Sequence, residues 1–327
     1  MLSGMARSKT PTIIDIAAAA GVSKSAVSRA LLGQGDVSPE TRRRVEEAAK
    51  RLGYVANAMA RGLVSSRTRT LGVVLRDVKK PYYAYLQAGM QAQAERRDYR
   101  IVTTTNAGEA EVEDAIREIT NLISLQVDGL IIAPARLPAT EYIPYLARCP
   151  IVVAGRREDH PRISSVACDE HEGGVLLGRH LVGLGHRDIT VLLVDEDYSV
   201  RYHSRGAGMI AGVRDAGGRV EVRAMPTDLQ AAEHVADLTT TAVMCPTDAA
   251  AIDVLDVVSG VAVTGFDGYG PLAAPYIGLT TFRQPVEEMG RTAVDLLVDQ
   301  LEGITDEDRF VSLHGSVVAG RTASVGV

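Results

Sequence analysis

The stretch "IIDIAAAAGVSKSAVSRALLG" occupies residues 13–33 of a 327-residue chain, and two short helical patterns meet within it. Thr12 followed three residues later by Asp15 is typical of a capping box, which predicts that a first helix begins there. Gly21 can adopt the left-handed conformation that ends a helix, and Val22 supplies an apolar side chain at the turn. The sequence therefore predicts a first helix that stops just before the glycine.

A second helix is predicted over Lys24–Leu32, with Ser23 as its N-terminal cap. Its apolar side chains recur at helical spacing, at Ala26, Val27, Ala30 and Leu31. The other face is polar and basic, and it consists of Lys24, Ser25, Ser28 and Arg29. A third helix is predicted to open at Ser38-Pro39-Glu40 and to stop at Gly53. Three short helices with a glycine turn between the first two make a helix-turn-helix unit.

The polar face of the second helix suits double-stranded DNA, because a small helix fits a major groove roughly 12 Å wide. Lys24 and Arg29 can donate to guanine edges or phosphates, and Ser25 and Ser28 can contact bases or phosphate oxygens. Residues 1–70 contain 12 Lys and Arg against 5 Asp and Glu, whereas the remainder contains 23 against 36. A basic head on an acidic body predicts that only the head meets a polyanion. The alternative is a helical hairpin that caps a larger domain.

The sequence "TIIDIAAAAGVSKSAVSRALLG…VSPETRRRVEEAAKRLGYVANAMARGL", within residues 12–63, closely resembles the N-terminus of the lac repressor family of bacterial transcription regulators. The resemblance implies that the first positions of the second helix read bases. It assigns DNA contacts to Thr12, Ser23, Lys24, Ser25, Ser28, Arg29, Val37, Ser38 and Tyr54.

The same resemblance implies a hinge helix in "NAMARGL", residues 57–63, which would fold on operator DNA. Asn57 would cap it, Ala60 would lie at a close approach, and Leu63 would wedge into the minor groove. Gly62 lowers helix propensity there by up to ~1 kcal/mol, which fits an element ordered only on binding. A flexible linker is the alternative.

From Thr70 onward, short β-branched runs alternate with helical ones. Strands are predicted at TLGVVL, YRIVTT, GLIIAP, IVVAG, DITVLLV, TAVMC and VAVTGF, with helices such as Pro81–Arg97 and Glu170–Leu184 between them. Repeated strand-helix units build doubly wound parallel sheets, whose ligands bind at the carboxyl ends of the strands.

Motifs such as "VTGFDG" and "LTTFRQPVEEMGRTAVDLLV" resemble the effector domain of the same family. That domain is akin to periplasmic sugar-binding proteins, so the resemblance implies two α/β lobes joined by three crossovers. The crossovers are expected near Val166–Asp169, Thr281–Gln284 and Arg309–Leu313. The expected divisions are a helix-turn-helix domain at 10–56, a hinge and linker at 57–69, and an effector-binding and dimerisation domain at 70–327. Its first lobe would span about 70–166 and 284–308, and its second lobe about 168–281 and 310–327.

The resemblance also suggests effector contacts in the body: Tyr82, Tyr83, Arg156, Arg205, Thr247, Asp267 and Gln284. Arg205 and Asp267 suit the hydroxyls or carboxylate of a ligand, and the two tyrosines can stack on a sugar face. The alternatives are a surface salt bridge for the Arg and Asp, and ordinary packing for the tyrosines.

Two departures from the family pattern make the effector's identity harder to infer. The stretch between Asp248 and Val261 is shorter than usual, and Gly155 stands where many relatives carry Asp. A small sugar or related polyol is the expected effector, with a nucleobase as runner-up. The chain ends without a leucine-heptad tail, which favours a homodimer over a tetramer.

The composition narrows the class of protein. No apolar run is long enough to span a bilayer, and the N-terminus lacks the apolar stretch of a signal peptide. Cys149, Cys168 and Cys245 are far apart and odd in number, as expected for buried thiols in a reducing cytoplasm. Met5 is an alternative start to Met1. No metal-binding or catalytic motif is present, so we expect no cofactor, no metal and no enzymatic activity.

These observations predict a cytoplasmic, sequence-specific DNA-binding regulator. We expect a repressor whose operator affinity depends on a small molecule bound between the lobes. A sugar-binding solute receptor without regulatory activity is the alternative, and its lobes would look the same. A sugar-modifying enzyme with a DNA-binding head is a third reading, but the sequence offers no acid/base pair for it.

Overall fold

The structure is a computed structural model that describes residues 11–32, 35, 37–54, 67–105, 112–133, 137–273, 276–304 and 309–324. The chain divides into two compact units, Met1–Thr68 and Arg69–Val327. The predicted hinge at residues 57–63 lies outside the described residues. The first unit is called the head and the second unit the body.

The head contains the three predicted helices, which are α1 (Ile13–Ala20), α2 (Lys24–Leu32) and α3 (Pro39–Leu52). Thr12 and Asp15 form the capping box, and Gly21 ends α1 in the left-handed region at φ 64°. Gly53 ends α3 in the same way, at φ 66°. The local capping signals were therefore sufficient to predict these helices.

One side chain from each helix is fully buried in the centre of the head: Ile16, Val27 and Val45. Alanines fill the space around them, so the helices can pack closely on a core this small. Arg44 donates to the carbonyl of Ala20, one of the carbonyls left without an intrahelical partner at the end of α1. The core thus holds α2 against α1 and α3, and the rest of the surface of α2 faces away from them.

The first lobe of the body contains a sheet of six described strands in the order β11-β5-β4-β3-β1-β2. Its strands are β1 (Thr70–Leu75), β2 (Arg100–Thr105), β3 (Gly129–Ala133), β4 (Ile151–Ala154), β5 (Ser164–Cys168) and β11 (Phe310–Leu313). Its helices are α5 (Pro81–Arg96), α6 (Val112–Ser124), α7 (Ala139–Tyr142), the short 3-10 helix η1 (Ile143–Ala147) and α11 (Val286–Glu302).

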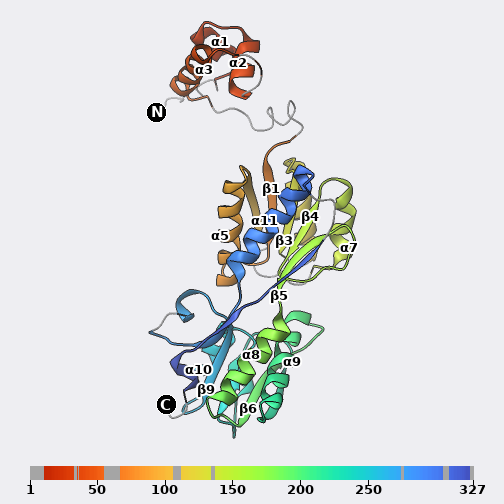
Figure 1. The fold of residues 1–327 in the computed structure, drawn as a ribbon, viewed down its shortest axis with the longest axis vertical. Helices are drawn as coiled ribbons and strands as arrows, with labels where there is room; N and C mark the ends of the chain where they lie inside the picture. The colour runs from red at the N-terminus through yellow and green to blue at the C-terminus, as the bar shows by residue number, and fades with distance from the viewer. Residues whose placement is uncertain are drawn as a thin grey trace, which may run out of the picture. The chain divides into compact units, whose positions relative to one another are not determined.

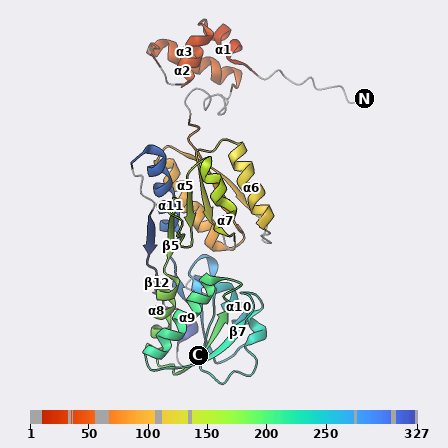
Figure 2. The same cartoon turned by 90° about the vertical axis from the view of Figure 1, so that its right-hand side faces the viewer.

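Alternate residues of β1 face opposite layers of the first lobe. Val73 packs under α5 and α11, whereas Val74 packs under α6 and α7. Figures 1 and 2 show these two helix pairs on the two faces of the sheet. Because both faces are covered, the central strands β3 and β4 consist of buried apolar residues and glycine, which is why they were recognisable as buried parallel strands.

The second lobe contains another six described strands, in the order β12-β10-β9-β8-β6-β7. Its strands are β6 (Asp188–Val194), β7 (Arg219–Met225), β8 (Ala242–Met244), β9 (Ala262–Asp267), β10 (Thr280–Arg283) and β12 (Ser316–Val318). Its helices are α8 (Glu170–Gly183), α9 (Val200–Asp215) and α10 (Asp248–Leu255), with 3-10 helices η2 (Ala231–His234), η3 (Gly270–Ala273) and η4 (Arg321–Ala323). The expected two-lobed α/β architecture with parallel sheets is confirmed, except that β12 runs antiparallel to β10.

The chain passes between the lobes three times: after β5, after β10 and after β11. The third passage lies later than expected, because Phe310–Leu313 pairs in parallel with β5 of the first sheet. The prediction that residues 310–327 belong entirely to the second lobe is therefore wrong for this strand. A short β-branched run at a sheet edge does not itself indicate which lobe it joins.

Glycines bring one pair of helices into backbone contact in each lobe. A side-chain Cβ at Gly208 of α9 would lie 2.1 Å from the carbonyl oxygen of His171 in α8. In the first lobe, a Cβ at Gly89 of α5 would lie equally close to the carbonyl of Glu287 in α11. Both helix pairs start near the crossovers, so this packing holds them rigidly beside the junction of the lobes.

We predict that Gly208→Ala lowers the free energy of unfolding by about 1–3 kcal/mol, because the added methyl group meets backbone that cannot rotate away. The measurement is chemical denaturation followed by circular dichroism. Gly183→Ala is the matched control, since a Cβ there meets nothing within 4 Å. Equal stability of the Gly208→Ala protein and the wild type would contradict the proposed close packing.

Candidate functional site

The outward face of α2 carries the side chains that the sequence selected for base contacts. Lys24, Ser25 and Arg29 are exposed, and Ser28 is half-buried. The Arg29 Nε donates to the carbonyl of Ser25 at 3.4 Å, which keeps the guanidinium along the helix. The face is therefore compact, basic and rich in hydroxyl groups, with the properties needed to enter a major groove.

Other predicted DNA contacts have structural roles in the head. The side chains of Thr12, Ser23 and Ser38 accept hydrogen bonds from backbone N–H groups at the starts of the three helices. Val37 and Tyr54 are half-buried against the core of the head. A capping hydroxyl can still donate to phosphate, so these roles do not exclude DNA contact. The remaining predicted contacts lie outside the described residues: Asn57, Ala60 and Leu63.

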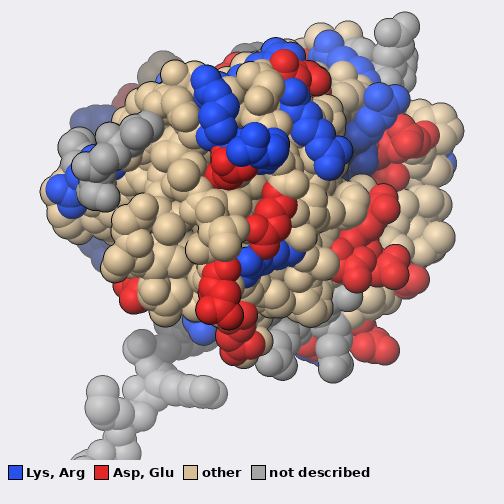
Figure 3. All heavy atoms as spheres, turned by 90° about the horizontal axis from the view of Figure 1, so that it is seen from below, with Lys and Arg blue, Asp and Glu red and all other residues tan. Residues whose placement is uncertain are grey.

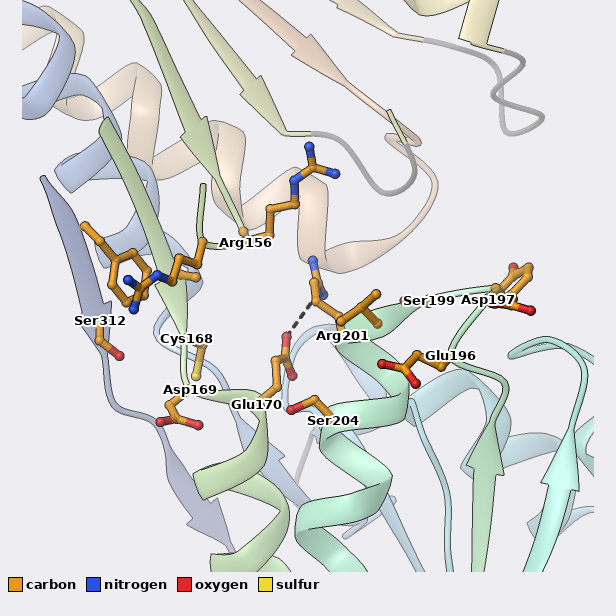
Figure 4. Close-up of a pocket in the computed structure, with 16 residues that line it drawn as sticks. Arg156, Cys168, Asp169, Glu170, Glu196, Asp197, Ser199, Arg201, Ser204 and Ser312 are labelled. Carbon is orange, nitrogen blue, oxygen red and sulfur yellow. Dashed lines mark ion pairs between the residues drawn. The ribbon is translucent and has the colours of Figure 1, made fainter. Parts of the chain in front are cut away.

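In the body, a cavity of about 760 Å³ lies between the two lobes. Arg156, Cys168 and Phe310 line it from the first lobe, and Glu170 and Arg201 line it from the second (Figure 4). Cavities of this size accommodate small metabolites. A smaller cavity of about 80 Å³ adjoins it, because Arg201 lines both.

Four of the predicted effector contacts meet at the smaller cavity: Tyr82, Tyr83, Thr247 and Asp267. The two tyrosine rings stand edge to face, with their centroids 5.1 Å apart, and both are buried. Thr247 caps α10 by accepting a hydrogen bond from the N–H of Ala250 at 3.1 Å. Both tyrosines therefore pack in the core and also line the cavity. Packing and ligand contact, the two roles considered from the sequence, are thus compatible.

The other predicted contacts are held by protein groups. Arg205 is fully buried, and its Nε donates to Glu170 at 2.9 Å. Gln284 is also fully buried and donates to the Asp267 carboxylate at 2.8 Å. Arg156 lines the larger cavity, but its Nη2 donates to the carbonyl of Leu137 at 2.8 Å. Arg205 and Gln284 thus lie beneath the cleft and hold Glu170 and Asp267, respectively, in place.

Sequence reasoning missed Arg201 and Glu170. Arg201 lies one helical turn before Arg205, so both side chains project from the same side of α9. The Glu170 carboxylate is 3.0 Å from Arg201 Nε and 2.8 Å from Arg205 Nη2, so one carboxylate serves two guanidinium groups. The spacing of the two arginines was the available signal, but it does not reveal which of them reaches the cavity.

Asp267 is the strained residue of the site. It has a φ of 135°, a region that non-glycine residues rarely occupy and that often marks functional sites. Burial raises its pKa to about 7, although the nearby Arg205 guanidinium, at 3.6 Å, favours the ionised form. Burial likewise raises the pKa of the neighbouring Asp248. The site therefore contains a carboxyl group that can change its charge near neutral pH.

An ion pair with a buried carboxylate also crosses between the lobes. Lys80 Nζ, which precedes α5 in the first lobe, lies 3.0 Å from the carboxylate of Asp228 in the second. The Tyr198 hydroxyl donates to the same carboxylate at 2.8 Å. Separating the lobes would break this pairing, because Lys80 and Asp228 belong to different lobes. The Asp228 side chain is only 3% exposed, so the loss of its cationic partner would be costly. The pair consequently favours the arrangement of the two lobes in this structure.

Several classes of site are absent from the described part of the chain. No group of three or more His, Cys, Asp or Glu there is placed to hold a metal ion. None of its helices has the length and apolar character needed to cross a membrane. The face in Figure 3 carries acidic and basic side chains interspersed over a largely uncharged surface, without a large field of one sign.

Comparison with protein families gives two matches. Residues 12–57 match the model for bacterial regulatory proteins of the lacI family. Residues 179–323 match the periplasmic binding protein-like domain. The first match covers the head, and the second covers most of the second lobe and the returning C-terminal segments.

Curated relatives and solved structures extend over nearly the whole chain. Catabolite control protein A of Priestia megaterium is 28% identical, over 92% of this chain and 96% of that protein. The sucrose operon repressor of Lactococcus lactis subsp. lactis is 29% identical, over 88% and 93%. A lac repressor dimer bound to operator and an anti-inducer is 25% identical, with a TM-score of 0.82 over 97% of this chain and 100% of that chain. A complex of the regulator CelR with cellobiose is 26% identical, with a TM-score of 0.65 over 95% and 99%.

The raised pKa of Asp267 predicts a pH dependence of stability. The folded state holds this proton more tightly than the unfolded state, so stability is lost as pH rises from about 4, the unfolded value, to about 7. Between pH 5 and pH 8, Asp267→Asn should lose less unfolding free energy than the wild type, by about 2–3 kcal/mol. The measurement is urea denaturation at both pH values.

Asp197→Asn is the control, because it removes a carboxylate from an exposed loop. An Asp267→Asn protein with the same pH dependence as the wild type would show that the carboxyl group titrates equally in the folded and unfolded states.

Proposed function

The chain belongs to the lac repressor family of DNA-binding transcription regulators, and on that premise we propose that it is a repressor whose operator affinity is set by a sugar-like molecule bound between the lobes. The observation that carries this proposal is the pairing of two surfaces in one chain. The head presents Lys24, Ser25 and Arg29 outward on a small helix, and the body encloses a cavity of about 760 Å³.

On the DNA side, we propose that a homodimer places two copies of α2 in successive major grooves of a near-palindromic operator. Arg29 and Lys24 would contact guanine edges or phosphates. Residues 57–63 would form the hinge on the bound duplex, with Leu63 at its centre bending the site. Binding of this kind displaces counterions, so affinity should fall steeply as salt rises.

On the effector side, aromatic rings and hydrogen-bonding groups surround the cavities, as a polyhydroxylated ligand requires. The name of the sucrose operon repressor and the cellobiose in the CelR complex support a sugar-like molecule. Ligand binding would change the angle between the lobes and separate the hinges. Operator affinity would then fall by the coupling energy, typically 1–3 kcal/mol.

The rival function, a solute receptor without regulatory activity, does not explain the head. A receptor has no use for a basic helix-turn-helix unit, whereas a regulator of transcription requires one. Because such a regulator acts on the chromosome, we place the protein in the cytoplasm. The curated relatives of the chain are regulators of transcription and not enzymes.

The test is selection of bound duplexes from a random-sequence DNA pool. The wild type should enrich a near-palindromic site, and Arg29→Ala should relax the preference at one position of each half-site. Loss of a bidentate contact to guanine costs about 1–3 kcal/mol of discrimination. Titration of the enriched duplex and a scrambled duplex measures the change.

Arg43→Ala is the matched control, since Arg43 is exposed on α3 and pairs with Glu47 at 3.9 Å. It should leave base preference unchanged. If the wild type enriches no sequence, the proposed function is wrong; if Arg29→Ala keeps the wild-type preference, only the assignment of Arg29 is wrong.

A further inference from the structure

The body begins at Arg69, and several contacts hold this residue in place. Its backbone has a φ of 51°, in the left-handed region, and its N–H donates to the Asp128 carboxylate at 2.8 Å. Its Nη1 lies 3.5 Å from the carboxylate of Glu302, the last residue of α11. Its guanidinium carbon lies 5.0 Å from the ring centroid of Tyr99. The backbone and the side chain of the first residue of the body are therefore both tied to the first lobe.

Arg97 joins the start of the body to α11. It follows the last residue of α5, and its carbonyl accepts from Arg69 Nη1 at 3.5 Å. Its guanidinium contacts three carboxylates on successive turns of α11: Asp295 at 2.8 Å, Asp299 at 2.9 Å and Glu302 at 3.2 Å. Single ion pairs on a surface contribute little, but a network with shared carboxylates has a defined geometry. Because Glu302 pairs with both arginines, the position of Arg69 depends on that of α11.

The same network reaches the starts of β5 and β11. Arg309, which precedes β11, lies 3.4 Å from the other oxygen of Asp299. The Arg309 N–H donates to the hydroxyl of Ser164, where β5 begins, at 3.2 Å, and Gln300 of α11 donates to that hydroxyl at 2.7 Å. Ser164 is fully buried, so these bonds are shielded from water. We name the charged members of this network the entry cluster: Arg69, Arg97, Asp295, Asp299, Glu302 and Arg309.

The three segments that meet at the entry cluster are those that lead to the crossovers. β5 runs from the cluster to the first crossover, and β11 runs from it to the third. α11 begins after the second crossover and ends at the cluster. Figure 1 shows α11 extending along the first lobe from the junction of the lobes to the end where β1 begins. Each crossover is thus connected to the entry cluster by one regular element.

We propose that the entry cluster transmits movements at the junction of the lobes to Arg69, and so to the segment that leads to the head. This inference rests on the proposed function and names residues that couple the body to DNA binding. Arg69 and Arg97 are positioning residues, which act through α11 and contact neither ligand nor DNA. A shift of α11 along its axis changes which carboxylates the two arginines can reach, so it also moves the start of the body.

The test is a double-mutant cycle on the full-length protein, measured by hydrogen–deuterium exchange. Lys80→Met removes the ion pair with Asp228 and so perturbs the junction without any ligand. It should raise the exchange rate of the peptide that covers residues 69–75 by roughly twofold or more. In the Arg97→Met background the same substitution should have almost no further effect. A merely structural role for Arg97 predicts instead that the two effects add.

Two further variants keep the test decisive if Arg97→Met does not fold. Arg69→Met removes a partner of Glu302 from a side chain that is 47% exposed, and it should reduce the response to Lys80→Met by about half. Arg97→Lys should recover part of the response, because a lysine supplies the charge without the planar fork.

Arg179→Met is the matched control, because Arg179 is exposed on α8 and pairs with Asp215 at 3.3 Å. It removes an arginine from an ion pair outside the entry cluster, so the response to Lys80→Met should stay at its wild-type size.

A second readout is affinity for the duplex that the wild type enriches. Lys80→Met should change this affinity, and Arg97→Met should remove most of that change. The inference is overturned if Lys80→Met leaves exchange at residues 69–75 unaltered, or if the effects of the two substitutions are additive in either readout. If no duplex is enriched, the proposed function fails, and the exchange cycle still decides whether the cluster connects the junction to Arg69.

Discussion

The Glu170 carboxylate is the contact on which the arrangement of the cleft depends. It begins α8 directly after the first crossover, and it pairs with Arg201 and Arg205 from α9. Removing one member of a buried charge cluster leaves the others uncompensated, which typically costs several kcal/mol. This carboxylate therefore helps to hold Arg201 at the junction and Arg205 beside Asp267. Glycine contacts between α8 and α9 hold the backbone that carries all three charges.

The connection between the cleft and the rest of the body runs through the crossovers. Asp267 ends β9, and it accepts a hydrogen bond from Gln284 at the second crossover. From there the chain enters α11, which packs against α5 and the first sheet. A ligand that binds beside Asp267 would thus act on the segments that join the lobes. This is a physical route for coupling, because both ends bias one movable junction.

Much of the fold was predictable because its signals are local or periodic. The caps at Thr12 and Ser38 and the stops at Gly21 and Gly53 gave the helices of the head, and apolar runs gave the central strands. The polar edge strand β7 has no such run, and β11 could not be assigned to a lobe without its pairing partner. The spacing of residues also could not distinguish an arginine that lines the cleft from one buried behind it. That distinction depends on Glu170, which comes from a different helix.

We propose that a ligand bound in one cleft of the body controls the affinity of the head for DNA. Linkage requires that an effector and an operator change each other's affinity by the same factor. The direct measurement is operator affinity with and without saturating effector, together with effector affinity with and without saturating operator duplex. We predict two equal factors, each about 5-fold to 150-fold. An effector that binds the cleft with the same affinity whether or not DNA is bound would contradict it.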